Sequence, residues 1–136
     1  IINDEEARQL SKEYSLVRAA KIIRDMGPKT LIIKKGEHGA LLFHEENIFF
    51  APALPLEEVF DPTGAGDTFA GGFMGYLAAT NDSSFENMKR AIIAGSALAS
   101  FCVEKFGTQR LTEITIEDIN HRISQFVKLS NFEMNL

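Results

Sequence analysis

The residues best suited to chemistry lie in the segment 61–69, Asp-Pro-Thr-Gly-Ala-Gly-Asp-Thr-Phe, here called the glycine-rich run. Two glycines precede Asp67, and a long apolar segment follows it. This order predicts a turn that opens into a helix, with free backbone N–H groups and the positive end of the helix dipole directed at one point. Such a point attracts a phosphate or a developing oxyanion, and the Asp67 carboxylate beside it can accept a proton from an alcohol. An anion site next to a base suits phosphoryl transfer to a hydroxyl group.

The same residues allow a purely structural interpretation. Glycine-rich turns precede many helices, and an Asp that caps a helix stabilises it by about 1 kcal/mol. The run is not a P-loop either, because that loop needs Lys followed by Ser or Thr after its last glycine, whereas Asp67 follows Gly66 here. Only the complete pattern is therefore informative.

The complete run closely resembles the C-terminal signature of the ribokinase-like, or PfkB, family of carbohydrate kinases, D-[PT]-T-G-A-G-D-x-F-x-x-G. Other segments resemble family motifs in the expected order. Residues 3–7 resemble the N-x-x-E motif, residues 34–40 the T-x-G-x-x-G segment that borders the nucleotide, and residues 94–97 with 106–107 the late helix and turn beside the adenine. The resemblance covers essentially the whole chain.

The resemblance covers only the C-terminal half of the family's domain. Ile1-Ile2 looks like the end of a strand, and the N-x-x-E motif follows at once. We therefore expect residues 1–136 to be the C-terminal nucleotide-binding and catalytic portion of a PfkB kinase domain, without the N-terminal half and lid. That half supplies most sugar contacts in the family, so the chain alone is expected to be inactive.

The resemblance implies roles at the glycine-rich run. Asp67 is the expected catalytic base that deprotonates the acceptor hydroxyl. Gly64, Ala65 and Gly66 are expected to form the anion hole for the transferring phosphoryl group. Because deprotonation can lag behind bond cleavage in a loose transition state, Asp67 need not be a strong base.

The resemblance also implies metal ions. Asn3 and Glu6 match the pair that organises Mg²⁺, which we expect to act through waters because Mg²⁺ usually retains several. The alternative is that Asn3 caps a helix and Glu6 is a first-turn acid. Asp61 and Thr63 match residues whose oxygens, with the loop near Gly107, hold K⁺ in many family members. Asp61 could instead form an Asx-turn without an ion.

The nucleotide contacts implied by the resemblance involve Lys34, Gly36, Glu37, Gly39 and Ser96. The two glycines would let the backbone run against the base and ribose. Lys34 occupies the usual Thr position, and its ammonium either reaches a phosphate as a point charge or extends into solvent. Ser96 lies near a position that often holds Asn beside the adenine.

The function implied is an ATP-dependent phosphotransferase that transfers the γ-phosphate to an alcohol group of a small substrate, with a sugar as the first choice. The alternatives are a nucleoside or vitamin kinase of the same fold, or a catalytically inactive nucleotide-binding relative. Asp67 and the small residues at Gly64 and Gly66 are intact, which counts against the inactive relative. The run with Phe69 resembles the sugar and nucleoside branch more than the vitamin branch.

Composition limits the other classes. The formal net charge is −5 and no Lys/Arg cluster is present, so nucleic acid is not an expected partner. Cys102 is the only cysteine, which excludes an internal disulfide and a multi-cysteine metal site. No apolar stretch is long enough to span a membrane, and no signal sequence is visible. We expect a cytoplasmic location, and a homodimer is an open option for the full-length parent.

The elements that must position these residues alternate between helices and strands, which predicts an α/β fold. The resemblance specifies a three-layer α/β/α sandwich, ribokinase-like, with only its C-terminal part present. Helices are expected at 5–14, 16–26, after the glycine-rich run to about 77, 85–104 and 115–129. A strand buried on both faces, typical of a parallel sheet, is expected at 30–33, and a hairpin at 39–43 and 47–51.

Periodicity also predicts which side chains are buried. Leu10, Val17, Ala20 and Ile23 form a helical stripe. The core is also expected to contain Cys102. Gly71, Gly72 and Gly75 each cost up to about 1 kcal/mol in a helix, which indicates close approach to another backbone or to a ligand.

Ligands of open α/β sheets bind beyond the carboxyl ends of the strands. Asn3, Lys34 and Asp61 all follow expected strands or the segments after them. We therefore predict that Glu6, Gly36 and Asp67 line one cleft. The core behind that cleft is expected to contain Phe69, Phe73 and Ile92.

Overall fold

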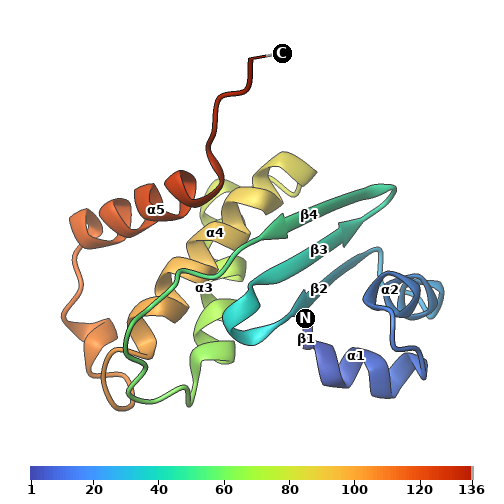
Figure 1. Cartoon of the computed structure of the whole chain (residues 1–136), viewed down its shortest axis with the longest axis horizontal. Helices are drawn as coiled ribbons and strands as arrows, with labels where there is room; N and C mark the ends of the chain where they lie inside the picture. The colour runs from blue at the N-terminus through green and yellow to red at the C-terminus, as the bar shows by residue number, and fades with distance from the viewer. Residues whose placement is uncertain (136) are drawn as a thin grey trace. The chain divides into compact units, whose positions relative to one another are not determined.

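The computed structural model describes residues 1–135. The chain forms two compact units, Ile1–Ala51 and Pro52–Leu136. Figure 1 shows the elements of both units in chain order. None of the helices in the described part of the chain is long and apolar enough to cross a membrane.

The first unit is built on a four-stranded sheet in the order β1-β2-β3-β4. Its strands are β1 (Ile2–Asn3), β2 (Thr30–Lys34), β3 (Ala40–His44) and β4 (Asn47–Ala51). β1 and β2 are parallel, whereas the pairs β2–β3 and β3–β4 are antiparallel. The predicted hairpin is confirmed. The purely parallel setting expected for the strand at 30–33 was wrong, because the hairpin that follows it returns antiparallel to β2.

The middle of β2 is buried as predicted, at Leu31, Ile32 and Ile33. Alternate side chains of a strand point to opposite faces of the sheet, so Leu31 and Ile33 share one face and Ile32 takes the other. Leu31 and Ile33 belong to a core cluster with Ala7 and Ala20 from the two helices of this unit. These helices are α1 (Asp4–Ser11) and α2 (Leu16–Asp25).

The predicted stripe on α1 and α2 is only partly correct. Ala20 and Ile23 are buried, whereas Leu10 and Val17 are 53% and 59% exposed. The helix face that meets the core is narrower than the stripe, and α1 presents the small Ala7 to it.

The first helix also ends earlier than residue 14, the end expected from the sequence. Lys12 adopts a left-handed conformation with φ 59° and its N–H donates to the Arg8 carbonyl, which terminates α1 at Ser11. Ser15 then caps α2, with its side chain accepting from the Arg18 N–H.

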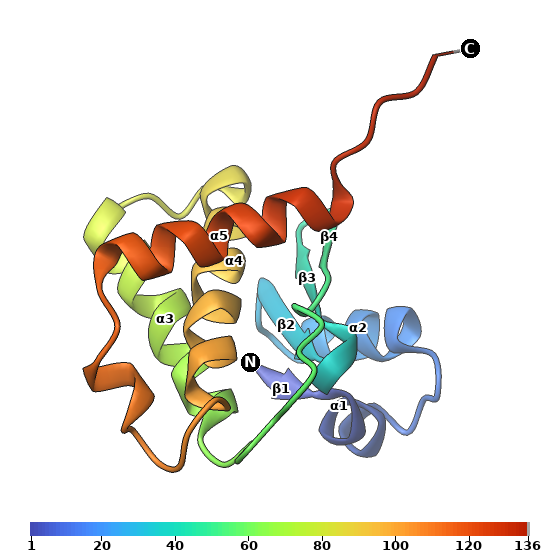
Figure 2. The same cartoon turned by 60° about the vertical axis from the view of Figure 1, so that its left-hand side comes forward.

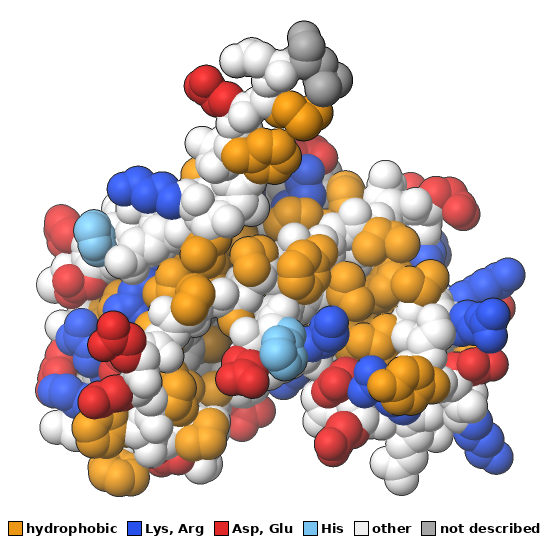
Figure 3. All heavy atoms as spheres, viewed as in Figure 1, with side chains coloured by type: hydrophobic (Ala, Val, Ile, Leu, Met, Phe, Trp, Pro, Cys, Tyr) orange, Lys and Arg blue, Asp and Glu red, His pale blue; other side chains and the backbone are white. Residues whose placement is uncertain are grey.

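Within this unit, α1 and α2 do not cover the edge strand β4. Ile48 lies opposite Phe43, so both point to the face that carries the core cluster. Phe43 is buried, but Ile48 and Phe50 are 54% and 51% exposed. Large apolar side chains are also visible on the molecular surface in Figure 3.

In the described part of the second unit, all regular secondary structure is helical. This unit contains α3 (Ala65–Thr80), α4 (Phe85–Cys102), the short 3₁₀ turn η2 (Arg110–Thr112) and α5 (Ile116–Ser130). α5 begins with a capping box, in which Thr115 and Asp118 satisfy each other's backbone N–H groups. Residues 131–135 have no regular secondary structure, and residue 136 lies outside the described residues.

α3 and α4 lie side by side (Figure 2). A Cβ added at Gly72 would lie 2.8 Å from the Gly95 Cα, and one added at Gly95 would lie 2.6 Å from the Phe69 carbonyl oxygen. The predicted close approach is therefore confirmed at Gly72. At Gly71 and Gly75 an added Cβ would meet no protein atom within 4 Å, so no other backbone approaches these two glycines, and the ligand alternative stays a prediction.

The predicted core residues of this unit are buried. Phe69, Phe73 and Ile92 are 5%, 4% and 0% exposed, and Cys102 is 3% exposed. The small residues on α3 and α4 let the two backbones meet, and these larger side chains fill the space around the contact.

Candidate functional site

The glycine-rich run opens α3 as the sequence predicted. Gly64 is the N-cap and adopts the left-handed conformation, with φ 80° and ψ −2°, which only glycine adopts without strain. Its carbonyl accepts the Thr68 N–H at 2.9 Å, closing the first helical turn. The Thr68 hydroxyl donates to the same carbonyl at 2.8 Å.

The N–H groups at this helix start are only partly used. Ala65 donates to the Pro62 carbonyl at 3.2 Å, so its N–H is not available to a ligand. The N–H groups of Gly64, Gly66 and Asp67 have no acceptor within residues 1–135. Unsatisfied N–H groups at a helix N-terminus form an anion site, which is the geometry expected from the sequence.

Asp67 lies in the first turn of α3 and is not the helix cap. No side chain caps this helix, since Gly64 occupies the N-cap position. The Asp67 side chain is exposed, and among the described residues it accepts no hydrogen bond and forms no ion pair. The structural interpretation of Asp67 as a cap is therefore wrong, and its carboxylate is free to meet a ligand.

Asp61 forms the Asx-turn that the sequence left open. Its Oδ1 accepts the Thr63 N–H at 2.9 Å. Hydrogen bonds from the Thr63 backbone, then from the Thr63 side chain, then from the Gly107 backbone hold the pKa of Asp61 below its ordinary value. Asp61 and Thr63, two residues of the expected K⁺ site, are thus joined by a hydrogen bond, and the K⁺ site itself stays a prediction.

These residues fit a monovalent cation. A carboxylate has about four lone-pair positions, so Asp61 keeps acceptor capacity after the hydrogen bonds it receives. No group of three or more His, Cys, Asp or Glu side chains arranged for a metal is found in the described part of the chain. An oxygen set made of one carboxylate plus hydroxyl and carbonyl groups suits a hard ion of low charge.

In the first unit, Asn3 and Glu6 form a capping box at the start of α1. Asn3 Oδ1 accepts the Glu6 N–H at 2.8 Å, and Glu6 Oε2 accepts the Asn3 N–H at 2.8 Å. The capping alternative is therefore present in this structure. Glu6 Oε1 remains uncommitted by that box, so the Mg²⁺ role implied by the resemblance stays a prediction.

Lys34 lies beside Asn3, because the two are register partners in the parallel pair β1–β2. Both residues thus stand at the carboxyl ends of their strands, as expected. A 3₁₀ turn, η1 (Gly36–His38), follows, and Gly36 and Gly39 have φ values of 55° and 100°. The Lys35 N–H closes this turn on the Gly39 carbonyl at 2.7 Å.

The remaining predicted nucleotide residues are less informative. Glu37 is exposed and lies 3.7 Å from the exposed His38 ring. Ser96 lies in the middle of α4 and is partly buried. The joint cleft for Glu6, Gly36 and Asp67 stays a prediction, since its residues belong to different units.

Sequence reasoning missed the groups beneath the glycine-rich run. The Val103 carbonyl accepts N–H groups from Phe60 at 2.9 Å and Asp61 at 3.4 Å. The Cys102 Sγ lies 3.8 Å from the Thr63 carbonyl oxygen, which it meets as a weak donor. Contacts between residues this far apart in sequence leave no local pattern that could have revealed them.

The model of the pfkB family carbohydrate kinases matches residues 1–115. A cytidine kinase from Thermococcus kodakarensis is 43% identical over 74 residues, which are 53% of this chain and 26% of that protein. An aminoimidazole riboside kinase from Salmonella typhimurium is 36% identical over 106 residues, 78% of this chain and 33% of that protein.

Solved structures give the same fold. The aminoimidazole riboside kinase from Salmonella enterica, complexed with aminoimidazole riboside and an ATP analog, has a TM-score of 0.77 and 32% identity. The ribokinase from Thermotoga maritima has a TM-score of 0.73 and 27% identity. Each match covers 90% of this chain and 40% of the other chain.

These findings confirm the α/β, ribokinase-like fold predicted from the sequence. The chain spans between 26% and 40% of the length of the relatives named. It belongs to the pfkB family of carbohydrate kinases.

Proposed function

We propose that residues 1–136 are the C-terminal, nucleotide-binding and catalytic portion of an ATP-dependent kinase that phosphorylates a hydroxyl group of a small substrate. One observation carries the proposal: at the start of α3, unsatisfied N–H groups lie next to the exposed, unpaired carboxylate of Asp67. Family membership supports the same reaction class.

The reaction follows from these groups. Asp67 accepts the proton of the acceptor hydroxyl as its oxygen bonds to the γ-phosphorus. The bond between that phosphorus and the bridging oxygen of ATP breaks, so the products are a phosphate ester, ADP and a proton that leaves through Asp67. The free N–H groups of Gly64, Gly66 and Asp67 stabilise the charge on the transferring phosphoryl oxygens. The Ala65 N–H donates to the Pro62 carbonyl, so Ala65 contributes only a small side chain that leaves room for the phosphoryl group.

ATP and Mg²⁺ are the proposed cofactors. Structures of relatives are described as bound to an ATP analog, or to ADP and a metal ion. When bound, Mg²⁺ would neutralise phosphate charge, and Asn3 and Glu6 would hold it through water. Asp61 and Thr63 would hold K⁺, which would help order the run. No step requires Asp67 to contact either metal.

Nucleotide contacts are proposed for the strand end and turn of the first unit. Lys34 would place a point charge near a phosphate. Gly36 and Gly39 would allow the backbone, with Glu37, to run close to the base and ribose. Ser96 is the proposed contact from α4.

The acceptor is proposed to be a sugar or the sugar ring of a nucleoside. The sequence favours a free sugar as the first candidate. Relatives named as cytidine kinase, nucleoside kinase and aminoimidazole riboside kinase favour a nucleoside as the second candidate. Both classes offer a primary hydroxyl on a small ring.

The test uses a protein that joins this chain to the N-terminal half of its kinase domain. ATP-dependent formation of phosphate ester is measured over a panel of free sugars and nucleosides. We expect turnover with at least one member and none from residues 1–136 alone. Absence of turnover across the panel, in a folded protein that binds ATP, would favour the inactive nucleotide-binding relative.

A further inference from the structure

The last turn of α4 lies directly beneath the glycine-rich run. The Val103 carbonyl accepts the N–H groups of Phe60 and Asp61, at the point where the chain enters the run. One residue earlier, Cys102 Sγ meets the Thr63 carbonyl at 3.8 Å. A Cβ added at Gly64 would lie 4.0 Å from the same sulfur. The position of the run therefore depends on the position of residues 102 and 103.

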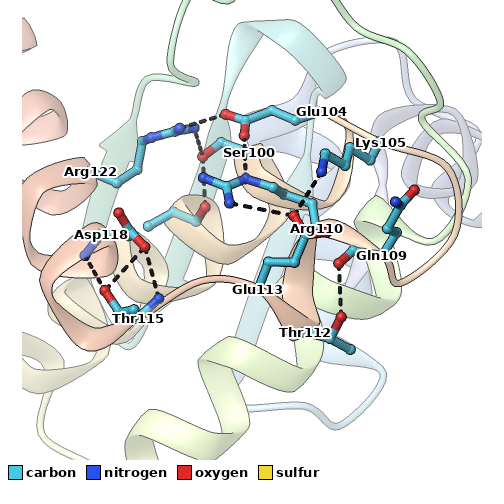
Figure 4. A network of polar contacts seen from close by, with 11 residues as sticks. Ser100, Glu104, Lys105, Gln109, Arg110, Thr112, Glu113, Thr115, Asp118 and Arg122 are labelled. Atoms are coloured by element: carbon cyan, nitrogen blue, oxygen red, sulfur yellow. Dashed lines mark hydrogen bonds and ion pairs between the residues drawn. The ribbon is translucent and has the colours of Figure 1, made fainter.

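The next residue, Glu104, is fixed by two arginines (Figure 4). Arg110 Nε donates to Glu104 Oε2 at 3.0 Å, and Arg122 Nη2 donates to Oε1. Arg122 Nη1 also donates to the Ser100 hydroxyl at 2.8 Å. Both oxygens of the carboxylate are thus held, one from η2 and one from α5.

The arginines are packed as well as paired. The guanidinium carbon of Arg122 lies 3.9 Å from the Phe101 ring centroid, and that of Arg110 lies 5.3 Å from it. The Arg122 side chain is only 13% exposed. Pairs that are shielded from water and formed by planar guanidinium groups hold a geometry more firmly than exposed pairs do.

We propose that Arg122, acting through Glu104, is a positioning residue for the glycine-rich run. It holds the last turn of α4 where the Val103 carbonyl and the Cys102 thiol support residues 60–64. That support sets the position of the free N–H groups at the start of α3. The consequence for catalysis rests on the proposed function, whereas the effect on the run does not.

Cys102 provides a readout that is independent of kinase activity. It is the only cysteine of the chain, it is buried, and the run covers its sulfur. The rate at which 5,5′-dithiobis(2-nitrobenzoic acid) modifies Cys102 is measured in residues 1–136 under native conditions. We expect Arg122→Ala to raise this rate about tenfold, because local opening exposes a buried group without global unfolding.

Two controls separate positioning from loss of stability. Arg90→Ala removes an exposed arginine of α4 that takes no part in the pairs with Glu104, and it should leave the rate unchanged. Phe126→Leu weakens the buried side of α5 but keeps Arg122. At a temperature where Phe126→Leu and Arg122→Ala have equal unfolding free energies, only Arg122→Ala should show faster modification of Cys102 than the wild type.

A double mutant tests the route through Glu104. If Arg122 acts through Glu104, Arg122→Ala combined with Glu104→Gln should react no faster than the faster single variant. Arg122→Lys keeps the charge but loses the planar fork, so its rate should fall between those of the wild type and Arg122→Ala. If the two substitutions raised the modification rate independently, so that their effects added, Arg122 would not act through Glu104.

The proposal is overturned if Cys102 in Arg122→Ala reacts at the wild-type rate or at the rate of the stability-matched Phe126→Leu. In the joined kinase, Arg122→Ala should also lower kcat about tenfold with the KM for ATP within about twofold, since small misplacements of reacting groups are costly. An unchanged kcat would overturn the positioning role in catalysis. If even the wild type showed no turnover, the proposed function would fail, and the thiol measurement would still decide whether Arg122 positions the run.

Discussion

Gly72 of α3 and Gly95 of α4 meet backbone to backbone: a Cβ on Gly72 would lie 2.8 Å from the Gly95 Cα. The contact lies two turns into α3, on the helix whose first turn carries the free N–H groups and Asp67. Because α4 also supports the glycine-rich run through Cys102 and Val103, this contact fixes α3 and its start to the same helix.

Replacement of Gly95 should therefore cost stability. In Gly95→Ala the new Cβ meets the Phe69 carbonyl oxygen at 2.6 Å, so the helices must separate. We expect a loss of about 1–3 kcal/mol in unfolding free energy by urea titration. Gly75→Ala is the matched control, because its Cβ meets nothing within 4 Å and the helix gains about 0.5–1 kcal/mol. Equal effects of both changes would contradict this packing.

Gly64→Ala should act through backbone conformation rather than through crowding. Its φ of 80° is left-handed, whereas the nearest atom to an added Cβ, Cys102 Sγ, is at an ordinary 4.0 Å. We expect a cost of about 1–2 kcal/mol and weaker binding of ADP, measured by calorimetry in the joined kinase. Gly71→Ala, with normal φ and open space, should instead gain about 0.5–1 kcal/mol from helix propensity and leave ADP binding unchanged.

The pKa of Asp61 should lie below that of an ordinary aspartate. Hydrogen bonding, first to Thr63 and then to the Gly107 backbone, lowers its pKa below that of an ordinary aspartate. A carboxyl whose pKa is lowered on folding contributes stability above its unfolded pKa, and this is lost as the pH falls through the folded pKa. The carboxyl resonance followed by NMR should therefore give a midpoint below that of an ordinary aspartate.

Thr63→Val tests the cause of that shift. It removes the side-chain hydrogen bond and keeps the backbone one, so the pKa of Asp61 should rise but stay below its ordinary value. A midpoint at the ordinary value in the wild type would contradict the Asx-turn.

The two interpretations of Glu6 can be separated by one substitution. Glu6→Gln keeps an oxygen to accept the Asn3 N–H, so the unfolding free energy should change by less than about 0.5 kcal/mol. The loss of negative charge should raise the Mg²⁺ concentration needed for half-maximal kinase activity. Asn3→Ala removes the cap and should cost about 1 kcal/mol. An unchanged Mg²⁺ requirement in Glu6→Gln would leave only the capping role.

Local signals predicted much of the fold. The capping box at Thr115 and the hairpin from 40 to 51 were predictable because each depends on residues close in sequence. The early end of α1 was not, since Lys12 is not a residue type that marks a left-handed position. Leu10 was misassigned because periodicity gives a stripe but not the width of the face that is covered.

In the candidate site, too, features that are local in sequence were predictable and contacts between distant residues were not. The turn at Gly64 and the carboxylate at Asp67 lie in one short run, for which the resemblance implies roles. The supports under that run join distant residues: Cys102 meets Thr63, and Arg122 holds Glu104. Neither pair has a sequence spacing that indicates a contact, so only the structure reveals them.

The most direct test of the account is the turnover of Asp67→Asn in the joined kinase. The account predicts that kcat falls by about 10²–10⁴-fold, the usual contribution of a general base, while the Kd for ATP stays within about twofold. Asp25→Asn, an exposed carboxylate at the end of α2, is the control and should leave kcat unchanged. Near-normal kcat in Asp67→Asn would contradict the assignment of Asp67 as the base and, with it, the central claim.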